Sequence, residues 1–353
     1  MHIAFITVGD TARRTGGYLY HAEVFRRLRA FDIEITEISV SDADVAAQQS
    51  AQSALGATFN PLRFDVVVVD ALARVICEPW LARWHAARPL VAMVHELPSV
   101  AGSSDAVVEA PLLRADRVIA VSRHGRAILE QRGVPAERIR VVSPGCDRLV
   151  ADDGRRTIDH PTPVAGCRLS VVVLCVAQWI PRKGILELVQ AWAARPRSGA
   201  VLELVGETDA DPDYAVTVRA AIAVAPKTSP IRVRGVVSDE ELEKAYRTAT
   251  MFALPSRYEG YGMAYAEALR HGLPVVACPV GPVPELVGAA GLLVPPCDGE
   301  ALANALDLLL CDEALRRDLG MAARTQAAML PTWDDTARAF CAVLEEARVQ
   351  RGA

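Results

Sequence analysis

Short apolar runs that do not alternate with polar residues constrain the fold of this chain more than any other feature. "FDVVVVDA" at residues 64–71 and "LSVVVLCVAQ" at residues 169–178 are two of them. This pattern is typical of parallel strands, because helices cover both faces of such a sheet. Segments with helical periodicity, such as "RHGRAILEQRG" and "KGILELVQAWAA", follow apolar runs. We therefore expect an α/β fold built from doubly wound sheets.

The strand–helix alternation is interrupted once. With 353 residues the chain is longer than one hydrophobic core usually supports. Between Pro144 and Gly166, proline, glycine and charged residues replace the apolar pattern, as in a linker. We expect Rossmann-like domains at residues 1–160 and 161–330, and an amphipathic helix at residues 331–353.

Composition excludes several classes of protein. Hydrophobic residues make up 51% of the chain, which is enough for buried cores. A net charge of -5 without long like-charge blocks argues against nucleic-acid binding. The apolar run from Leu169 to Ala177 is under half of the roughly 20 residues that a membrane-spanning helix needs. A strand begins at Met1, so we expect no signal peptide.

The eight cysteines are not spaced as metal ligands. They include no Cys-x-x-Cys pair, and no histidine stands at ligand spacing from them. Most lie in apolar runs, so we expect buried thiols, a cytoplasmic location and no zinc site.

Pro255 to Gly281, "PSRYEGYGMAYAEALRHGLPVVACPVG", is the segment richest in chemistry. Gly260 and Gly262 would let the backbone approach a ligand, and N–H groups at the next helix start would favour an anion such as a diphosphate. Eight helical residues span about 12 Å, so Glu259 and Glu267 are too far apart for a glycosidase acid/base pair. They would instead hold hydroxyl groups at two ends of an elongated ligand. The alternative is that Glu267 is a solvated helix residue and that Glu259 is a charge at a helix N-terminus.

This segment resembles the Glu-x7-Glu signature of family-4 retaining glycosyltransferases. Other segments resemble that family in order, from "RRTGGY" through "VHELPS", "RVIAVSRHGRAIL", "VAQWIPRKGILELVQAW" and "GPVPELVGAAGLLVPPCDGEALANAL" to a late "TWDDTARAF". The similarity extends to about residue 345. It implies the GT-B architecture, in which two Rossmann-like domains face a cleft. It also implies that the C-terminal helix returns to the N-terminal domain and that the C-terminal domain binds most of a nucleotide-sugar.

The resemblance implies catalytic roles for three residues. Lys183 would neutralise the leaving phosphate. Glu259 would bind hydroxyls of the donor sugar. His95 would lie beside the transferred sugar. For Lys183 alone the alternative is a solvated charge, and for His95 alone it is an imidazole bound by backbone at a strand end.

Further residues would bind the substrates. Glu267 would hold the ribose hydroxyls, and Ser122 and Arg123 would face the acceptor. The remaining donor-binding residues are Gly16 and Gly17 near the diphosphate, and Gly260, Tyr261, Gly262 and Met263 beside the sugar. Gly16 and Gly17 are also compatible with an ordinary strand-to-helix turn.

One position departs from the family pattern. Many relatives carry an arginine five residues before the lysine, where this chain has Gln178. Our hypothesis is that Arg182 replaces the missing cation on the diphosphate.

The implied reaction is retaining transfer of a hexose from a nucleoside-diphosphate sugar, with UDP the expected nucleoside diphosphate, to a hydroxyl acceptor. A phosphate oxygen of the leaving group would take the acceptor proton, and no metal or other cofactor is expected. "DADPD" at residues 209–213 resembles a metal motif, but a polar loop is the favoured interpretation. We expect loops of the N-terminal domain, among them Ser41–Asn60, to contact the acceptor. Lipid, cyclitol, pterin, aminoglycoside and saccharide acceptors all stay open.

Other functions stay open as well. A non-hydrolysing nucleotide-sugar epimerase of the same fold is the main alternative. A dinucleotide dehydrogenase is disfavoured, because "TVGDTARRTGGY" lacks a Gly-x-Gly-x-x-Gly motif. Arg26, Arg27 and Arg29 on the first helix could touch anionic lipid, although a solvated helix face is the favoured interpretation.

Overall fold

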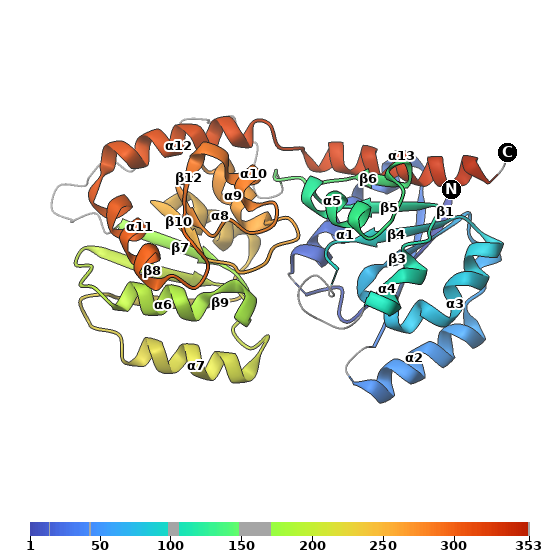
Figure 1. Ribbon diagram of the computed structural model, residues 1–353, viewed down its shortest axis with the longest axis horizontal. Coiled ribbons are helices and arrows are strands. Elements are labelled where there is room, and N and C mark those ends of the chain that lie inside the picture. The colour runs from blue at the N-terminus through green and yellow to red at the C-terminus, as the bar shows by residue number, and fades with distance from the viewer. Residues whose placement is uncertain (14, 42–43, 98–105, 148–170, 352–353) are drawn as a thin grey trace. The chain divides into compact units, whose positions relative to one another are not determined.

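The computed structural model describes residues 1–13, 15–41, 44–97, 106–147 and 171–351, except for the side chains of residues 106–108. The chain divides into two compact units (Figure 1). Unit 1 comprises Met1–Gly145 and Pro331–Ala353, and unit 2 comprises Cys146–Leu330. Each unit contains a six-stranded parallel sheet with helices, which confirms the expected fold class. The predicted domain boundary between residues 160 and 161 lies outside the described residues.

The sheet of unit 1 has the strand order β2-β1-β3-β4-β5-β6. Its strands are β1 (His2–Val8), β2 (Glu34–Val40), β3 (Val66–Asp70), β4 (Leu90–Val94), β5 (Arg117–Ala120) and β6 (Ile139–Val141). Its helices are α1 (Gly16–Leu28), α2 (Val45–Thr58), α3 (Arg74–Ala87), α4 (Ala106–Leu112), α5 (Arg123–Gln131) and α13 (Trp333–Gln350). The chain order of the strands reverses between β1 and β3.

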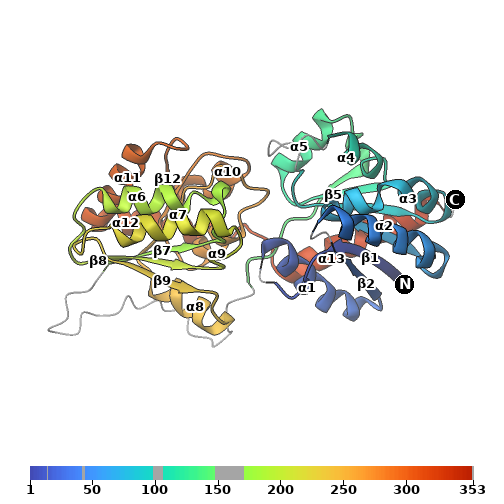
Figure 2. The same cartoon turned by 90° about the horizontal axis from the view of Figure 1, so that it is seen from below.

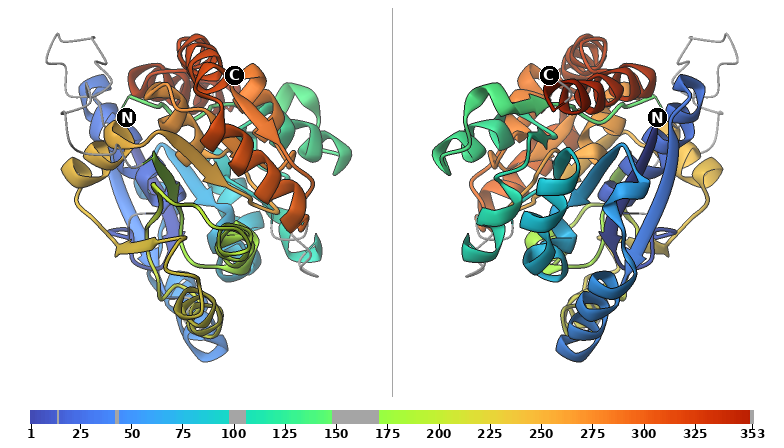
Figure 3. Two further views of the ribbon diagram at one scale, coloured as in Figure 1. Left: turned by 90° about the vertical axis from the view of Figure 1, so that its left-hand side faces the viewer. Right: turned by 90° about the vertical axis from the view of Figure 1, so that its right-hand side faces the viewer.

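Helices cover both faces of this sheet. The C-terminal helix α13 packs against α1 and contacts β3, β4 and β5, while α3 packs against α2 and α4. The right-hand panel of Figure 3 shows α13, in dark red, on the opposite side of the strands from α2 and α3. This arrangement explains the unalternated apolar sequence of β3, whose five residues are all buried.

One segment expected to be a loop is largely helical. Residues 41–60 were expected to form an acceptor-facing loop, but α2 occupies most of them. Asp44 caps this helix, because its carboxylate accepts a hydrogen bond from the Ala47 N–H at 2.7 Å. Alanines at residues 46, 47, 51, 54 and 57 add helix propensity that the sequence interpretation left out.

The sheet of unit 2 has the order β12-β11-β10-β7-β8-β9. Its strands are β7 (Val171–Val176), β8 (Ala200–Val205), β9 (Ile231–Gly235), β10 (Met251–Leu254), β11 (Val275–Ala277) and β12 (Gly291–Leu293). Its helices are α6 (Ile185–Ala193), α7 (Pro212–Ala223), α8 (Asp239–Thr248), α9 (Met263–Arg270), α10 (Val283–Val287), α11 (Gly299–Cys311) and α12 (Glu313–Ala327). Helix α6 packs with α7 and α11, and α12 packs with α9 and α10. Figure 2 shows α6 and α7 in front of the strands.

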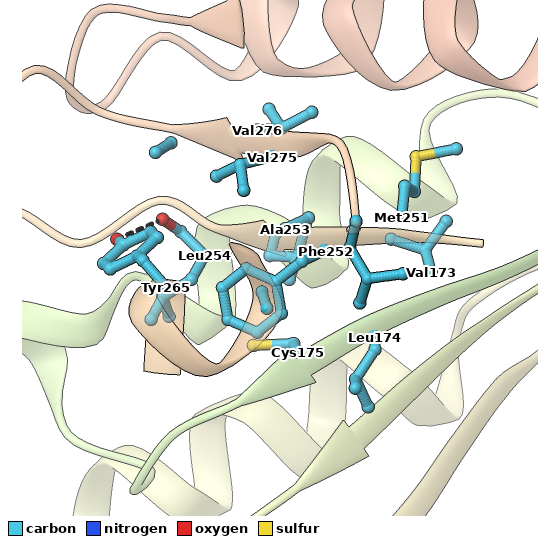
Figure 4. Packing of buried hydrophobic residues seen from close by; sticks show 14 of the residues in the cluster. Val173, Leu174, Cys175, Met251, Phe252, Ala253, Leu254, Tyr265, Val275 and Val276 are labelled. Atoms are coloured by element: carbon cyan, nitrogen blue, oxygen red, sulfur yellow. Dashed lines mark hydrogen bonds between the residues drawn. The ribbon is translucent and has the colours of Figure 1, made fainter. Parts of the chain in front are cut away.

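The centre of the unit 2 core lies where β7 and β10 pair. Figure 4 shows side chains from both strands packed together, among them Val173, Leu174 and Phe252. The chain order of the strands reverses between β7 and β10. In open parallel sheets, ligands bind outside the carboxyl ends of the strands at such a reversal. Loops that follow β7 and β10 are therefore the first place to look for a binding site.

The described cysteines are all free thiols, seven in number. Cys77, Cys146, Cys175 and Cys278 are buried, as expected for most of them, but Cys297 and Cys311 are exposed. Among the described helices, none has the length and apolarity needed to cross a bilayer.

Candidate functional site

The loops that follow β7 and β10 are joined by a lysine–glutamate pair. Lys183 Nζ lies 2.7 Å from Glu259 Oε1 and 2.9 Å from Oε2. Ser256 Oγ donates a third hydrogen bond to Oε1 at 2.6 Å. Glu259 is only 4% exposed. Lys183 is therefore not the solvated charge that its own sequence context allowed, and Glu259 is a buried partner of that lysine rather than only a charge before a helix.

A close backbone approach brings these two loops together. Gly184 follows Lys183 with φ of 69°, and a Cβ there would lie 2.3 Å from the carbonyl oxygen of Pro255. The Arg257 N–H also donates to the carbonyl of Arg182 at 2.7 Å. Only glycine fits this position without moving the backbone, so Gly184 permits the contact between Lys183 and the β10 loop.

The start of α9 is fixed against the end of β10. The Tyr265 hydroxyl donates to the Leu254 carbonyl at 2.7 Å, the bond drawn in Figure 4. Gly262, the residue before the helix, has φ of 101°. First-turn N–H groups have no acceptor within a helix and suit an anion. Gly260, Tyr261 and Gly262 lie between β10 and α9, and Met263 is the first residue of α9, so their predicted contact with a donor stays a prediction.

Glu267 lies on α9, and its carboxylate is bound by a tyrosine of α8, Asp239–Thr248. It is 8% exposed, and its Oε2 accepts a hydrogen bond from the Tyr246 hydroxyl at 3.0 Å. The Tyr246 ring stacks on His271, with 5.3 Å between centroids and 4° between planes. A solvated helix residue would have neither feature, so that alternative is wrong for Glu267.

Gln178 and Arg182, which stand on either side of the β7 loop, have protein partners. The Gln178 amide donates to Glu207 Oε2 at 2.6 Å. Arg182 Nη1 lies 3.4 Å from the carbonyl oxygen of Tyr258 and shares a short 3₁₀ turn with Lys183. The position of the missing arginine is thus occupied by an amide bound to a carboxylate, and the role of Arg182 stays a hypothesis.

In unit 1 the paired glycines begin a helix. Gly16 and Gly17 are the first two residues of α1, and Thr15 precedes them in extended conformation. A Cβ at Gly17 would lie 3.7 Å from His95 Cδ2, so the helix start packs beside the imidazole. The N–H groups of this first turn and the His95 side chain are therefore neighbours in unit 1.

His95 follows β4 and is bound to another histidine rather than to backbone. Its Nε2 lies 2.7 Å from Nε2 of His21 on α1. His21 Nε2 lies 3.6 Å from Asp70 Oδ2, which accepts a hydrogen bond from Thr7 Oγ1 at 2.9 Å. Burial lowers the pKa of His95 to about 4. His95 is therefore neutral at neutral pH and acts through hydrogen bonds rather than as a cation.

Asp70 is the charged end of this group. It is fully buried at the end of β3, and burial raises its pKa to about 6. Burial likewise lowers the pKa of His21 well below the ordinary value. At neutral pH the group comprises one carboxylate and two neutral imidazoles.

Sequence reasoning missed four residues that support the predicted ones: His21, Asp70, Ser256 and Tyr246. Asp70 carried a usable signal, because it is a carboxylate at the end of an otherwise apolar strand. His21 lies on the helix that begins at the paired glycines. Tyr246 lies on α8, which no motif connected to Glu267.

The predicted acceptor-facing residues lie at the start of α5. Ser122 is its N-cap, and the Ser122 hydroxyl accepts a hydrogen bond from the Gly125 N–H at 3.0 Å. Arg123 is the first helical residue. This helix cap explains a serine at this position even if Ser122 does not bind the acceptor substrate.

Two groups bear on metal binding. Ligand-capable atoms of His21, Asp70 and His95 lie within 4.8 Å of one another. In the "DADPD" segment, Asp209 pairs with Arg219, and Asp211 caps α7 by accepting from Tyr214. One carboxylate thus forms an ion pair and the other caps a helix, as expected for a polar loop, which was the favoured interpretation.

The basic face of α1 is largely paired. Arg26 and Arg27 both form ion pairs with Glu23, and Arg27 also pairs with Asp334 of α13 at 2.6 Å. These carboxylates offset the positive charge that lipid binding would require.

Two models of known protein families match this chain. Residues 19–148 match the family model described as Glycosyltransferase Family 4. Residues 170–312 match the model described as Glycosyl transferases group 1. The two matches fall in units 1 and 2 respectively.

Similar proteins point the same way. A D-inositol 3-phosphate glycosyltransferase from Acidothermus cellulolyticus is 30% identical over 74% of this chain and 63% of its own length. A GDP-mannose-dependent alpha-(1-6)-phosphatidylinositol monomannoside mannosyltransferase from Mycolicibacterium smegmatis is 32% identical over 72% of this chain and 68% of its own length. Sucrose-phosphate synthase from Thermosynechococcus elongatus is 24% identical over all of both chains, with a TM-score of 0.82. That structure has the same fold.

Proposed function

The chain belongs to glycosyltransferase family 4 and has the GT-B fold, and on this premise we propose that it transfers a hexose from a nucleoside-diphosphate sugar to a hydroxyl acceptor. The observation that carries the proposal is the Lys183–Glu259 pair at the strand reversal of unit 2, with Glu267 on the following helix. Glu259 and Glu267 are the two glutamates of the Glu-x7-Glu motif, and Lys183 stands where the resemblance implies a phosphate-binding lysine.

In the proposed complex, unit 2 holds most of the donor. Lys183 and Arg182 offset the charge of the diphosphate, and N–H groups at the start of α9 add to that field. Glu259 accepts hydrogen bonds from sugar hydroxyls and Glu267 from ribose hydroxyls. In unit 1 we assign the α1 start to the diphosphate, His95 to the transferred sugar, and Ser122 and Arg123 to the acceptor.

We further propose that transfer retains the anomeric configuration. The acceptor hydroxyl attacks the anomeric carbon on the face from which the diphosphate departs, and a phosphate oxygen of the leaving group takes its proton. The C–O bond to the diphosphate breaks as the new glycosidic bond forms. Lys183 stabilises the growing phosphate charge, so no divalent cation is needed for chemistry.

UDP-hexose is the proposed donor, on the strength of the resemblance. A guanine nucleotide is the alternative, because the mannosyltransferase relative is named for GDP-mannose. Acceptors in both relatives named above contain inositol, so a cyclitol, free or in a lipid, is the first acceptor class to test. The free thiols favour a reducing location, which we propose to be the cytoplasm.

A thermal-stability screen with UDP-, GDP- and ADP-sugars tests the donor. A ligand that binds only the folded protein raises the midpoint of unfolding, so one nucleotide class should do so and the others should not. The selected donor is then incubated with inositol and with inositol 3-phosphate, and the configuration of the product is read by proton NMR. EDTA should leave the rate unchanged.

Two results would contradict the proposal. If the donor alone is converted to an epimer, the protein is an epimerase of the same fold. If an acceptor yields a product with inverted configuration, the retaining mechanism is wrong.

A further inference from the structure

His95 is held by a buried chain of polar side chains that the proposed reaction does not yet use. The contacts run from Thr7 of β1 to Asp70 at the end of β3. From Asp70 they continue to His21 of α1 and then to His95 after β4. Asp70 is 0% exposed and His21 is 2% exposed. These elements are neighbours in unit 1 (Figure 1).

The His21–His95 contact requires a proton on one of the two Nε2 atoms. Two neutral imidazole nitrogens 2.7 Å apart repel each other unless one of them carries a hydrogen. If His21 Nε2 carries it, the N–H also faces the Asp70 carboxylate, whose Oδ2 is 3.6 Å away. If His95 Nε2 carries it, the His21 lone pair faces that carboxylate instead. The first arrangement is favoured by charge.

A second observation favours the same arrangement. His21 Nδ1 is buried and has no hydrogen-bond partner among the described residues. A proton on His21 Nε2 leaves only a lone pair at that buried nitrogen. The opposite arrangement would leave a buried N–H without an acceptor, which is the rarer and costlier defect.

We propose that His21 and Asp70 are positioning residues that hold His95 in the tautomer with its proton on Nδ1. His95 Nε2 is already occupied by His21, so Nδ1 is the ring nitrogen left for a ligand. His95 would therefore act only as a hydrogen-bond donor. Given the proposed function, that N–H would bind an oxygen of the transferred sugar or of the departing phosphate.

The spacing of these groups distinguishes the proposal from a zinc site. Two nitrogens bound to one tetrahedral zinc ion are about 3.4 Å apart, because each Zn–N bond is about 2.1 Å. The Nε2 atoms of His21 and His95 are 2.7 Å apart, which is a hydrogen-bond distance. Asp70 Oδ2 and His95 Nε2 both lie near one atom, His21 Nε2, at 3.6 and 2.7 Å, so a single N–H group faces two acceptors.

The test is long-range proton–nitrogen NMR of the full-length protein at neutral pH, with 15N-labelled histidine. The expected spectrum has His95 protonated at Nδ1 and His21 at Nε2. Asp70→Asn presents an amide in place of the carboxylate, so the expected result is a shift of the His95 proton toward Nε2. No substrate is needed, so the result does not depend on the proposed function.

Two substitutions of His21 separate positioning from packing. His21→Gln can still donate an amide hydrogen to His95 and should keep the Nδ1 tautomer. His21→Leu fills the apolar surroundings but donates nothing, so it should yield a mixture of tautomers. Phe25→Leu alters the ring that stacks on His21 without touching a nitrogen, and it should leave the tautomer unchanged.

Activity supplies a second readout. Once a donor is known, Asp70→Asn and His21→Leu should lower kcat by about tenfold to a hundredfold, while His21→Gln should stay within a few-fold of the parent. An Nε2-protonated His95 in the parent protein, or a tautomer unchanged in both Asp70→Asn and His21→Leu, would overturn the proposal. Retention of one zinc ion per chain that His21→Leu releases would do so as well.

Discussion

Lys183 Nζ lies within 2.9 Å of both carboxylate oxygens of Glu259, so one ammonium group bridges the whole carboxylate. Their side chains are 17% and 5% exposed. In the proposed reaction, Lys183 stabilises phosphate and Glu259 binds sugar hydroxyls. Before the donor arrives, the two side chains therefore neutralise each other at the place where they will act.

The first prediction concerns this pair. Lys183→Met should lower the free energy of unfolding by about 3 kcal/mol, because it leaves a buried carboxylate without its cation. The double variant Lys183→Met with Glu259→Gln should recover part of that loss. Urea unfolding of the parent, both single variants and the double variant measures the coupling energy.

A surface pair provides the matched control. Arg126 and Glu130 are 2.8 Å apart on α5, with side chains 42% and 41% exposed. The same set of four proteins made at this pair should yield a coupling below about 0.5 kcal/mol. Equal coupling at both pairs would show that burial adds nothing to the Lys183–Glu259 contact.

The second prediction compares two glycines with positive φ. Gly199→Ala adds a methyl group where no atom lies within 4 Å, so it should cost only the backbone strain of about 1 kcal/mol. Gly184→Ala has the same strain and also a clash with the Pro255 carbonyl, so it should cost about 3 kcal/mol. Thermal unfolding of both variants gives the comparison.

Donor affinity should separate the two glycines further. Gly184→Ala pushes Lys183 away from the β10 loop, whereas Gly199 lies immediately before β8. We expect weaker nucleotide binding only in Gly184→Ala. Normal binding by that variant would mean that the loop contact has no role in forming the site.

The fold was predictable because its signal is repeated and local. Apolar runs such as that of β3 and the helical periods between them gave both sheets and most helices. Helix α2 was missed because its sequence carries few large apolar residues, and only Leu55 of this helix is buried. A helix with so little buried surface depends on its cap and on alanine propensity, which periodicity does not detect.

The third prediction concerns Glu267. Tyr246→Phe removes the hydroxyl that holds its Oε2, so the parent should discriminate UDP from 2′,3′-dideoxy-UDP more strongly than the variant. We expect UDP affinity to fall about tenfold and dideoxy-UDP affinity to change little. Calorimetric titration of both ligands measures the two ratios.

Tyr214→Phe is the control for that experiment. The Tyr214 hydroxyl accepts a hydrogen bond from the Leu186 N–H, so this variant also loses one bond in unit 2 without touching Glu267. Its discrimination should equal that of the parent. Equal loss in both variants would assign the effect to general loosening of unit 2.

The fourth prediction concerns pH and Asp70. Burial raises its pKa from 3.8 to about 6, so the folded state favours the protonated carboxyl. Relative to Asp70→Asn, the parent should lose stability as pH rises from about 4 to above 6. The change should approach about 3 kcal/mol, since each pKa unit corresponds to about 1.4 kcal/mol.

Charged groups around Asp70 set the size of this effect. Hydrogen bonds from the Leu72 N–H and from the Thr7 hydroxyl lower the pKa of Asp70, as does Arg74 on α3, and all three are included in the value of about 6. Cys77 of α3 and His21 of α1 also face the carboxyl group, and burial keeps both neutral at neutral pH. Urea unfolding of parent and variant between pH 4 and pH 8, in steps of about half a unit, measures the difference. A difference that does not change with pH would contradict the prediction.

The candidate site was only partly predictable. Glu259, Glu267 and Lys183 carry a motif, and the structure places each of them on loops or helices at the β7–β10 reversal. Tyr246 and His21 could not be assigned, because their roles depend on contacts between elements distant in sequence: 21 positions separate Tyr246 from Glu267, and 74 separate His21 from His95. Spacing along one helix or strand contains no information about such contacts.

Calorimetric titration of the full-length protein with UDP and GDP tests most directly whether the β7–β10 reversal binds a donor. We predict saturable binding of one nucleoside diphosphate per chain, at least tenfold weaker in Lys183→Met and in Glu267→Gln, and unchanged in Arg126→Gln. Absence of saturable binding at millimolar nucleotide, or equal affinity in the parent and both site variants, would contradict the assignment of this site.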